Sequence, residues 1–505
     1  MAARETFELL CQHAREAALL ESVGYLLEWD ERTLMPQAGG PYRAEQITLL
    51  SALAHQRQTD PRIGAWLHEL CDSPLAADPH SDTGATVREL RRRYEKKTKL
   101  PQALVEELAR TAVLGQQAWV EARAKNDFAS FRPHLEKTIE LKQQQAECLG
   151  YTECRYDALL DDYEPAETTS NVARVLAGLR EELVPLVAEI AASNRRPRHE
   201  ILTGYYPEAR QREFGTEMGR RIGFDFSRGR LDVTVHPFCS TMGPHDCRIT
   251  TRYNEQHFPG AFFGILHEAG HGIYEQGLRA EQYGLPPGES ISLGIHESQS
   301  RMWENLVGRS HAFWEHAYRD AQRAFPEALG DVGLEDFYFA INDVRPSLIR
   351  VEADEATYNL HILVRFELEQ ALINDDLPVA DLPSVWNEKY RGYLGIVPPD
   401  DTQGVLQDIH WSAGLVGYFA TYSLGNLYAA QFFRAAERDL GDLAAQFRRG
   451  EFLPLREWLR KNIHEQGKRY SAAQLVERIT GRPLGHADLM AHLRGKFAPL
   501  YGLKG

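Results

Sequence analysis

The sequence predicts a mainly helical protein with one small β-sheet, and two observations carry this prediction. Apolar residues recur at i, i+3 and i+4 along most of the chain, the spacing that gives an amphipathic helix one buried face. Alternation of apolar and polar residues, typical of half-buried strands, is confined to 231–235 and 247–253. No linker, repeat or low-complexity segment divides the chain, so we expect a single domain over residues 1–505 that surrounds a cleft.

We expect that domain to have three parts. Residues 1–200 form helices along one wall of the cleft, residues 230–435 carry the metal and substrate sites, and residues 436–505 form C-terminal helices. Turn-rich or proline-led breaks separate the N-terminal helices. In chain order the signals are an apolar stripe from Leu9 to Leu27, a break at 35–41, a helix at 42–55, breaks at Asp60-Pro61 and Ser73-Pro74, a polar loop at 74–84, and helices at 101–150 and 168–194.

The composition is that of an ordinary globular protein, with 26% charged and 43% hydrophobic residues. The formal charge of −15 argues against a nucleic acid or an anionic membrane as partner. The one basic run, at 91–99, lacks the interleaved aromatic residues of a nucleic-acid site. We interpret it as a solvated helix face that ends before Pro101.

Cysteine usage and the N-terminal pattern predict a cytoplasmic protein. Six cysteines occur without a C-x-x-C pair, as expected for thiols in a reducing compartment. Cys239 and Cys247 flank a predicted hairpin and could form a disulfide, although we favour buried free thiols. The first residues enter an amphipathic pattern without a signal-peptide core. Residues 411–433 are uncharged and long enough to span a bilayer, but their glycines, tyrosines and polar residues favour a buried helix near the active site.

The most informative stretch is 262–272, an apolar run that contains His267-Glu268-x-x-His271. On a helix, residues four apart share one face, with Cβ atoms about 5–6 Å apart. Both imidazoles can therefore bind one metal ion, with Zn–N bonds of about 2.0–2.1 Å. Glu268 is turned by about 100° from His267, which places it beside the ion as a general base for a metal-activated water. The alternative is a buried helix whose histidines form hydrogen bonds elsewhere.

A catalytic zinc site normally has three protein ligands and a water. Glu275, four residues after His271, lies about 6 Å further along the same helix axis and cannot reach the same ion. The third ligand must therefore come from another segment. Glycines and prolines at 284–288 turn the chain, and Ser290 or Ser292 can then cap a new helix.

Glu297, on that new helix, is our third ligand. His296, on the same turn, is a weaker competitor for the same role. Glu297 could instead serve only as the ion-pair partner of Arg301, four residues later.

These residues resemble a known family, the thermostable carboxypeptidase Taq family of metallocarboxypeptidases. The resemblance spans essentially the whole chain, and no motif position departs from the family pattern. It implies a mostly helical, zincin-like fold around a deep active-site groove, similar to that of neurolysin and angiotensin-converting enzyme. The motifs that carry it, in order, are Trp29-Asp30-x-x-Thr33-x-Met35-Pro36, His236-Pro237-Phe238, Asp246-x-Arg248-x-Thr250, His267-Glu268-Ala269-Gly270-His271, His296-Glu297-Ser298-Gln299, Ile349-Arg350-x-x-Ala353-Asp354, Gly404-x-x-Gln407-Asp408-x-His410-Trp411 and Ile463-His464-x-x-Gly467.

The tetrahedral oxyanion of peptide hydrolysis needs a donor besides the metal. His410 is one candidate, and Tyr418 and Tyr422, expected on the uncharged helix that follows, are others. Zinc peptidases similar to this family use a histidine and a tyrosine from such a segment. The sequence leaves open which tyrosine acts, because either could be a buried tyrosine with core hydrogen bonds.

A carboxypeptidase must also recognise a free C-terminal carboxylate, to which the planar fork of arginine is suited. The resemblance gives this role to Arg350, whose alternative is a structural pair with Glu352 or Asp354. It links Arg248 to closing the groove and limiting substrate length, against a strand-face ion pair with Asp246. His236 has a motif but no physical role that we can name.

We therefore expect a metal-dependent carboxypeptidase of broad specificity that disfavours proline, because no acidic or basic side-chain pocket is evident and the family is similarly broad. The cofactor is expected to be zinc, although the same ligands would accept cobalt or manganese. The family resemblance also implies a homodimer. Two rival functions stay open: an endo-oligopeptidase of the neurolysin kind, which would cleave amidated peptides equally well, and a non-catalytic peptide-binding scaffold, which would have no use for Glu268.

Overall fold

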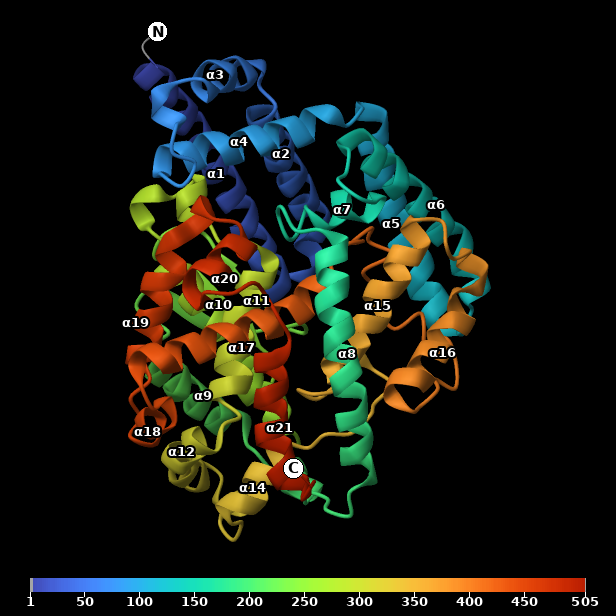
Figure 1. Cartoon of the computed structure of the whole chain (residues 1–505), viewed down its shortest axis with the longest axis vertical. Coiled ribbons are helices and arrows are strands. Elements are labelled where there is room, and N and C mark those ends of the chain that lie inside the picture. The colour runs from blue at the N-terminus through green and yellow to red at the C-terminus, as the bar shows by residue number, and fades with distance from the viewer. Residues whose placement is uncertain (1–2, 505) are drawn as a thin grey trace.

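The computed structural model describes residues 3–504 and is mainly helical with one three-stranded sheet, as predicted. Figure 1 shows the first helices at one end of the molecule and the long helix α8 on its front face beside α21. The N-terminal helices are α1 (Ala3–Thr33), α2 (Gly40–Gln58), α3 (Pro61–Cys71), α4 (Asp82–Lys99), α5 (Gln102–Lys125), α6 (Phe128–Leu149), α7 (Arg155–Leu160) and α8 (Thr169–Ala192).

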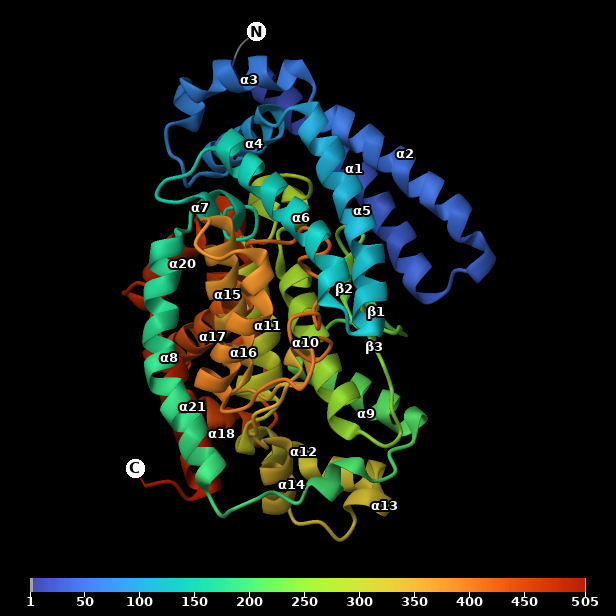
Figure 2. The same ribbon diagram turned by 90° about the vertical axis from the view of Figure 1, so that its right-hand side faces the viewer.

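Helices α1 and α2 pack together and extend to one side of the molecule, as Figure 2 shows. The predicted breaks are present, but prolines begin helices rather than only ending them: Asp60 caps α3, whose first residue is Pro61. The predicted polar loop ends slightly early, because Ser81 caps α4 from residue 82. A small core joins α1, α3 and α4 through Leu10, Ile63, Leu67, Leu70 and Val87.

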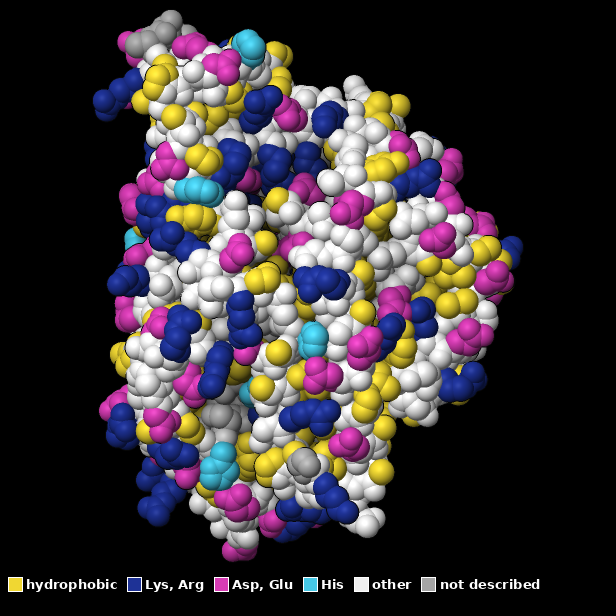
Figure 3. All heavy atoms as spheres, in the orientation of Figure 1, with side chains coloured by type: hydrophobic (Ala, Val, Ile, Leu, Met, Phe, Trp, Pro, Cys, Tyr) yellow, Lys and Arg dark blue, Asp and Glu magenta, His cyan; other side chains and the backbone are white. Residues whose placement is uncertain are grey.

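The basic run of α4 differs from the solvated face that we expected. Arg92 and Lys96 both contact Asp161, at 2.9 and 2.8 Å, and Arg93 pairs with Glu289. These side chains are only 22–32% exposed, so the run ties the N-terminal helices to later segments. Acidic and basic side chains are interspersed over the face seen in Figure 3.

The sheet directly precedes, in the chain, the helix that carries His267 and His271, which we call the metal helix. The strand order of the sheet is β1-β3-β2. Both predicted strands are present to within two residues, and β3 is the more buried of them. A three-residue strand, which is too short to show alternation, pairs antiparallel to β3, whereas β1 pairs parallel to it. The strands are β1 (Gly229–Val233), β2 (Cys239–Thr241) and β3 (Cys247–Thr251).

The metal helix α10 (Phe258–Gly277) packs on β3, on α9 (Glu208–Ile222) and on α11 (Leu293–Arg301). A Cβ at Gly270 would lie 2.6 Å from Ser300 Cα and 2.7 Å from Gln299 O. Glycine therefore lets the two helices approach closely enough for their side chains to share one site.

The rest of the chain is helical, and one core cluster runs from Trp119 to Tyr501. Across residues 3–504, no helix has both the length and the apolar composition needed to cross a membrane. After α11 come a π-helical turn (Met302–Val307), α12 (His311–Ala324), α13 (Pro326–Leu329), α14 (Leu334–Ile341), α15 (Tyr358–Ile373), α16 (Leu382–Leu394), α17 (Ala420–Leu440), α18 (Leu443–Arg448), α19 (Leu453–Asn462), α20 (Ala472–Thr480) and α21 (Ala487–Tyr501).

The prediction of one helix from residue 411 is wrong at its start. Residues 411–419 form turns and irregular backbone, and α17 begins at Ala420. Gly417 has a φ of +93°, and a Cβ there would lie 2.7 Å from Leu159 O. The backbone must therefore turn at this glycine before the helix can begin.

Candidate active site

His267 and His271 project from α10 towards Glu297 of α11, the group that we call the metal cluster. Their Nε2 atoms lie 3.7 and 3.5 Å from the same carboxylate oxygen, Glu297 Oε2. One donor atom from each residue lies within 4.8 Å of the other two. Two imidazoles and one carboxylate at this spacing form a donor set that suits a catalytic zinc ion.

Glu297 reaches this position because its helix begins at Ser292, whose hydroxyl accepts a hydrogen bond from the Ile295 N–H. Arg301 donates to Glu297 Oε1 at 2.7 Å, which leaves Oε2 directed at the histidines. The alternative predicted for Glu297, an ion pair with Arg301, is therefore also formed, because Arg301 contacts Oε1 and not the oxygen that faces the histidines. Burial alone would raise the pKa of Glu297, but Arg301 and the histidines hold that pKa well below its usual range.

His296, the competing ligand, is not among the three residues whose donor atoms share one site. Its Nδ1 is within hydrogen-bond distance of His271 Nδ1, and its Nε2 lies 2.8 Å from Glu275 Oε1. Glu275, excluded as a ligand from helix geometry, is therefore a hydrogen-bond partner of His296.

Glu268 follows the first histidine and is 7% exposed. Burial raises the pKa of its carboxyl to about 7, and the Glu297 carboxylate also raises it. A carboxyl in this range can both accept and return a proton near neutral pH. The two histidines lie in different electrostatic environments: Glu297 and Glu304 raise the pKa of His267 to about 9 despite its burial, whereas burial lowers the pKa of His271 to about 3.

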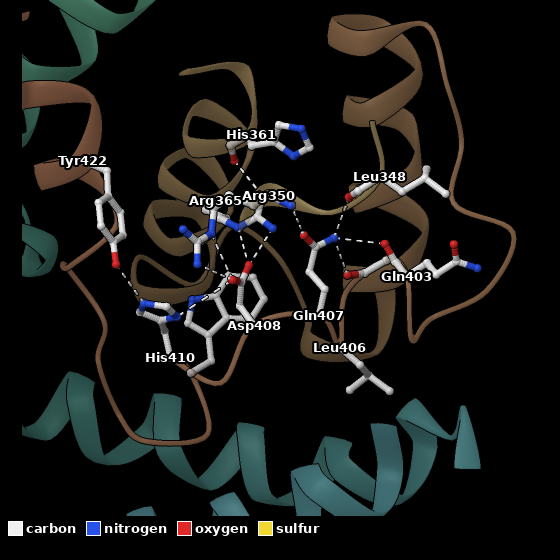
Figure 4. Close-up of polar contacts among 12 residues, drawn as sticks. Leu348, Arg350, His361, Arg365, Gln403, Leu406, Gln407, Asp408, His410 and Tyr422 are labelled. Atoms are coloured by element: carbon white, nitrogen blue, oxygen red, sulfur yellow. Dashed lines mark hydrogen bonds and ion pairs between the residues drawn. The ribbon is translucent and has the colours of Figure 1, made fainter. Parts of the chain in front are cut away.

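Arg350, Arg365 and Asp408 form a second group, the arginine cluster, which Figure 4 shows. Arg350 donates to Asp408 Oδ1 from Nε at 3.0 Å and from Nη2 at 2.8 Å, and Arg365 Nε donates to Asp408 Oδ2 at 2.6 Å. Our alternative partners for Arg350, Glu352 and Asp354, were wrong. Asp354 instead caps the turn at Thr357 and Ala356.

The arginine cluster is buried, with Arg350 5% and Arg365 0% exposed. Burial alone would raise the pKa of Asp408, but the two guanidinium groups hold it well below its usual range. Two cations therefore share one carboxylate, and the cluster keeps one net positive charge. Arg365 was missed because a lone arginine within an apolar helix gives no local signal; its partner Asp408 is distant in sequence.

His410 and Tyr422 lie beside the arginine cluster, with 3.5 Å between His410 Nε2 and the Tyr422 hydroxyl. Burial lowers the pKa of His410 to about 4 and holds the pKa of Tyr422 well above its usual value, so both are neutral at pH 7. Tyr418 lies in the turn before α17, not on the helix where we expected it, and its ring packs edge-on against Tyr163.

Arg248 pairs with Asp246, as its alternative reading predicted, through two contacts of 2.8 Å. Its guanidinium also lies 4.2 Å from the ring centre of Trp29 on α1. This cation–π contact joins the sheet to the first helix. His236 is exposed. Cys239 and Cys247 are free thiols, with their Sγ atoms 3.7 Å apart.

A cavity of about 470 Å³ extends from the far end of the metal helix towards α1. Glu275 and Gln276 line one side of it, and Glu21 and Tyr25 of α1 line the opposite side. Because Glu275 also contacts His296, the cavity begins two side chains away from the metal cluster.

Comparisons with known proteins agree along the whole chain. A family model described as carboxypeptidase Taq (M32) metallopeptidase matches residues 9–497. Thermostable carboxypeptidase 1 of Thermus thermophilus is 49% identical over 99% of this chain and 100% of its own, and carboxypeptidase 1 of Bacillus subtilis is 40% identical over 99% and 98%. Among solved structures, an M32 carboxypeptidase from Deinococcus radiodurans has a TM-score of 0.95 at 40% identity, covering 99% of this chain and 100% of that one. A Pyrococcus furiosus carboxypeptidase has a TM-score of 0.93 at 35% identity, covering 98% and 99%.

Proposed function

The chain belongs to the carboxypeptidase Taq (M32) family and is a metallocarboxypeptidase; from that premise we propose that it removes single C-terminal residues from peptides of broad sequence, with zinc on His267, His271 and Glu297. The observation that carries the proposal is the pairing of a complete donor set with a buried, positively charged arginine cluster. Cobalt and manganese remain alternatives for the same ligands.

A zinc ion held by His267, His271 and Glu297 would supply Lewis-acid polarisation of the scissile carbonyl and would lower the pKa of water. Glu268 is the general base: its buried carboxylate accepts a proton from the attacking water and returns it to the leaving amine. A pKa near 7 allows Glu268 both to accept this proton and to return it near neutral pH. Arg301 supports the chemistry indirectly, since it holds Glu297 by the oxygen that faces away from the histidines.

His410 and Tyr422 are the donors that stabilise the oxyanion. Both are neutral and only partly exposed, so each can donate a hydrogen bond without losing a charge. Tyr422 is the stronger candidate, because its hydroxyl lies 3.5 Å from His410 Nε2, whereas Tyr418 contacts His410 by ring packing, with ring centres 5.4 Å apart. We therefore assign the oxyanion role to Tyr422 and a packing role to Tyr418.

Arg350 recognises the substrate carboxylate. A guanidinium has five N–H donors, and Asp408 and Tyr358 take three of them. Two donors remain for a ligand. Asp408 neutralises only one of its two arginine partners, so a second carboxylate completes the charge balance of the arginine cluster.

We further propose a broad residue specificity, because the sequence shows no acidic or basic side-chain pocket, with proline disfavoured as the family resemblance implies. Arg248 limits the groove at the sheet end, because its contacts with Asp246 and Trp29 hold α1 against β3. This last assignment also gives the Trp29 motif a physical role.

The assembly that we propose is a homodimer of single-domain chains. The core cluster that runs from Trp119 to Tyr501 supports one folding unit over most of the chain. Exposed apolar side chains along the α1–α2 pair offer a surface for a second copy: Leu19, Val23, Leu34, Tyr42 and Leu49. Sedimentation of the wild type and of a Leu34→Glu, Leu49→Glu double variant tests this surface.

The experiment that tests the proposed activity uses one N-blocked peptide with either a free or an amidated C-terminus. The zinc-loaded enzyme is expected to release a single residue from the free acid and to leave the amide intact, with products read by mass. Internal cleavage of both peptides would favour the endo-oligopeptidase and remove the role of Arg350.

A further inference from the structure

The outer nitrogen of each ligand imidazole contacts a different kind of partner. His267 Nδ1 lies 2.9 Å from the carboxylate oxygen Oε2 of Glu304, and His271 Nδ1 contacts the imidazole of His296. An imidazole that gives Nε2 to a metal carries its proton on Nδ1. Each Nδ1–H is therefore a donor that needs an acceptor, and the structure provides one for each.

On the His271 side, this requirement fixes the direction of a chain of hydrogen bonds. His271 Nδ1–H donates to His296 Nδ1, so the proton of His296 must be on Nε2. That Nε2–H then donates to Glu275 Oε1 at 2.8 Å. His296 can act in this way only as one tautomer, and Glu275 selects that tautomer.

On the His267 side, the acceptor comes from an unusual piece of backbone. Glu304 lies in the π-helical turn Met302–Val307, which continues directly from α11. A π-helical turn holds one more residue than an α-helical turn, so it changes the direction in which Glu304 points relative to Glu297. Arg301 Nη1 at 3.4 Å and Arg309 Nη2 at 3.5 Å hold the Glu304 carboxylate in place.

We propose that Glu304 and His296 are positioning residues of the metal cluster: each fixes the ring orientation and tautomer of one histidine ligand, and Glu275 does the same for His296. The inference rests on the proposed metal ligation. It also gives a role to His296 and Glu275, which come from the two helices that carry the ligands. Removing such partners typically weakens metal binding about 10- to 100-fold.

The test measures zinc affinity by competition with a chromophoric chelator, and the visible spectrum of the cobalt-substituted protein. Glu304→Ala and His296→Phe are each expected to raise the zinc Kd about 10- to 100-fold and to change the cobalt spectrum. His296→Gln keeps a donor and an acceptor and should restore most of the affinity. If Glu304→Ala does not fold, Glu304→Gln, which keeps an acceptor without the charge, should lie between it and the wild type.

The matched control is Glu355→Gln. Glu355 is a buried carboxylate that also pairs with one histidine, His492, and one cation, Lys496, each at 2.6 Å, but it contacts no ligand. Its variant should keep the wild-type zinc Kd and cobalt spectrum. Wild-type protein that binds no zinc would contradict the proposed function itself. Wild-type binding with an unchanged Kd in Glu304→Ala, Glu304→Gln and His296→Phe would overturn only the present inference.

Discussion

The metal cluster and the arginine cluster are built in different ways. Tyr358 links them, because its hydroxyl accepts a hydrogen bond from Arg350 and its ring centre lies 4.4 Å from the guanidinium of Arg301, the partner of Glu297. The metal cluster uses two residues of α10 and one of α11, helices that are neighbours in sequence and pack closely at Gly270. The arginine cluster uses a 3₁₀ turn at Arg350, the middle of α15 at Arg365, and irregular backbone at Asp408. One cluster is local in sequence and the other is assembled by the fold.

We assign different tasks to the two clusters. In our proposal the metal cluster carries the bond-breaking chemistry, and each of its ligands contacts a partner of its own. We assign recognition of the substrate carboxylate to the arginine cluster, whose charge depends on three segments meeting at one aspartate. Damage to the first should abolish turnover, whereas damage to the second should change which peptides are cleaved.

The largest expected effect is on the metal side. Glu268→Gln removes the general base without changing the size of the side chain, so kcat on a free-acid peptide should fall about 10²- to 10⁴-fold. Metal content, measured by atomic absorption, should stay at the wild-type level. A variant with near-normal kcat and bound zinc would show that another residue acts as the base.

A matched pair of tyrosine variants tests which tyrosine stabilises the oxyanion. Tyr422→Phe should lower kcat roughly 100-fold, because it removes one oxyanion donor. Tyr418→Phe should change kcat less than about 10-fold, since its ring packing survives. Steady-state kinetics on one peptide compares them, and the reverse ranking would move the oxyanion role to Tyr418.

The remaining expected effect is on stability rather than on activity, and both clusters should share it. Burial raises the pKa of Glu369, which holds the turn before α17 through Trp411 and Gly417, to about 7. Burial also raises the pKa of Glu164, which holds the start of α11 through Ser292, to about 7. A raised carboxyl pKa means that the folded state retains a proton which the unfolded chain releases above pH 4.5. Stability is therefore lost as the pH rises from about 4.5 to 7.

Glutamine variants measure this contribution. Between pH 5 and pH 8 the wild type should lose roughly 2–3 kcal/mol more unfolding free energy than Glu369→Gln. Glu164→Gln should give a similar difference, although it acts on the metal side. Urea unfolding at the two pH values supplies the free energies, and parallel curves for wild type and variants would contradict the assignment.

The sequence predicted the metal side well because helix geometry is local. The spacing of His267 and His271, and the serine cap before Glu297, are set within a few residues. The sequence did not predict the residues that surround the ligand histidines. Glu304 lies in a π-helical turn, which has no sequence signature that we could read, and Glu275 was considered only as a ligand.

For the arginine cluster, the sequence pointed to Arg350 as a single residue but did not predict how the cluster is assembled. Arg350 was singled out from the family pattern, but its hydrogen-bond partner was sought within four residues and lies 58 positions away. Arg365 is buried in an apolar helix, where periodicity gives no reason to notice it. The start of α17 was misplaced because an uncharged run reads alike as a helix or a buried turn, and a packing contact at Gly417 decides between them.

The division of labour between the clusters is tested most directly at Arg350. We would measure kcat/KM for the free-acid and amidated forms of one N-blocked peptide with wild type, Arg350→Lys and Arg350→Gln, each checked for bound zinc. Loss of a charged hydrogen-bond partner costs about 1.5–3 kcal/mol, so Arg350→Gln should lose roughly 10- to 150-fold on the free acid. The ratio of free acid to amide should fall towards one, with Arg350→Lys between the two and zinc content unchanged. A preserved preference for the free acid in Arg350→Gln would contradict the account, because carboxylate recognition would then lie elsewhere.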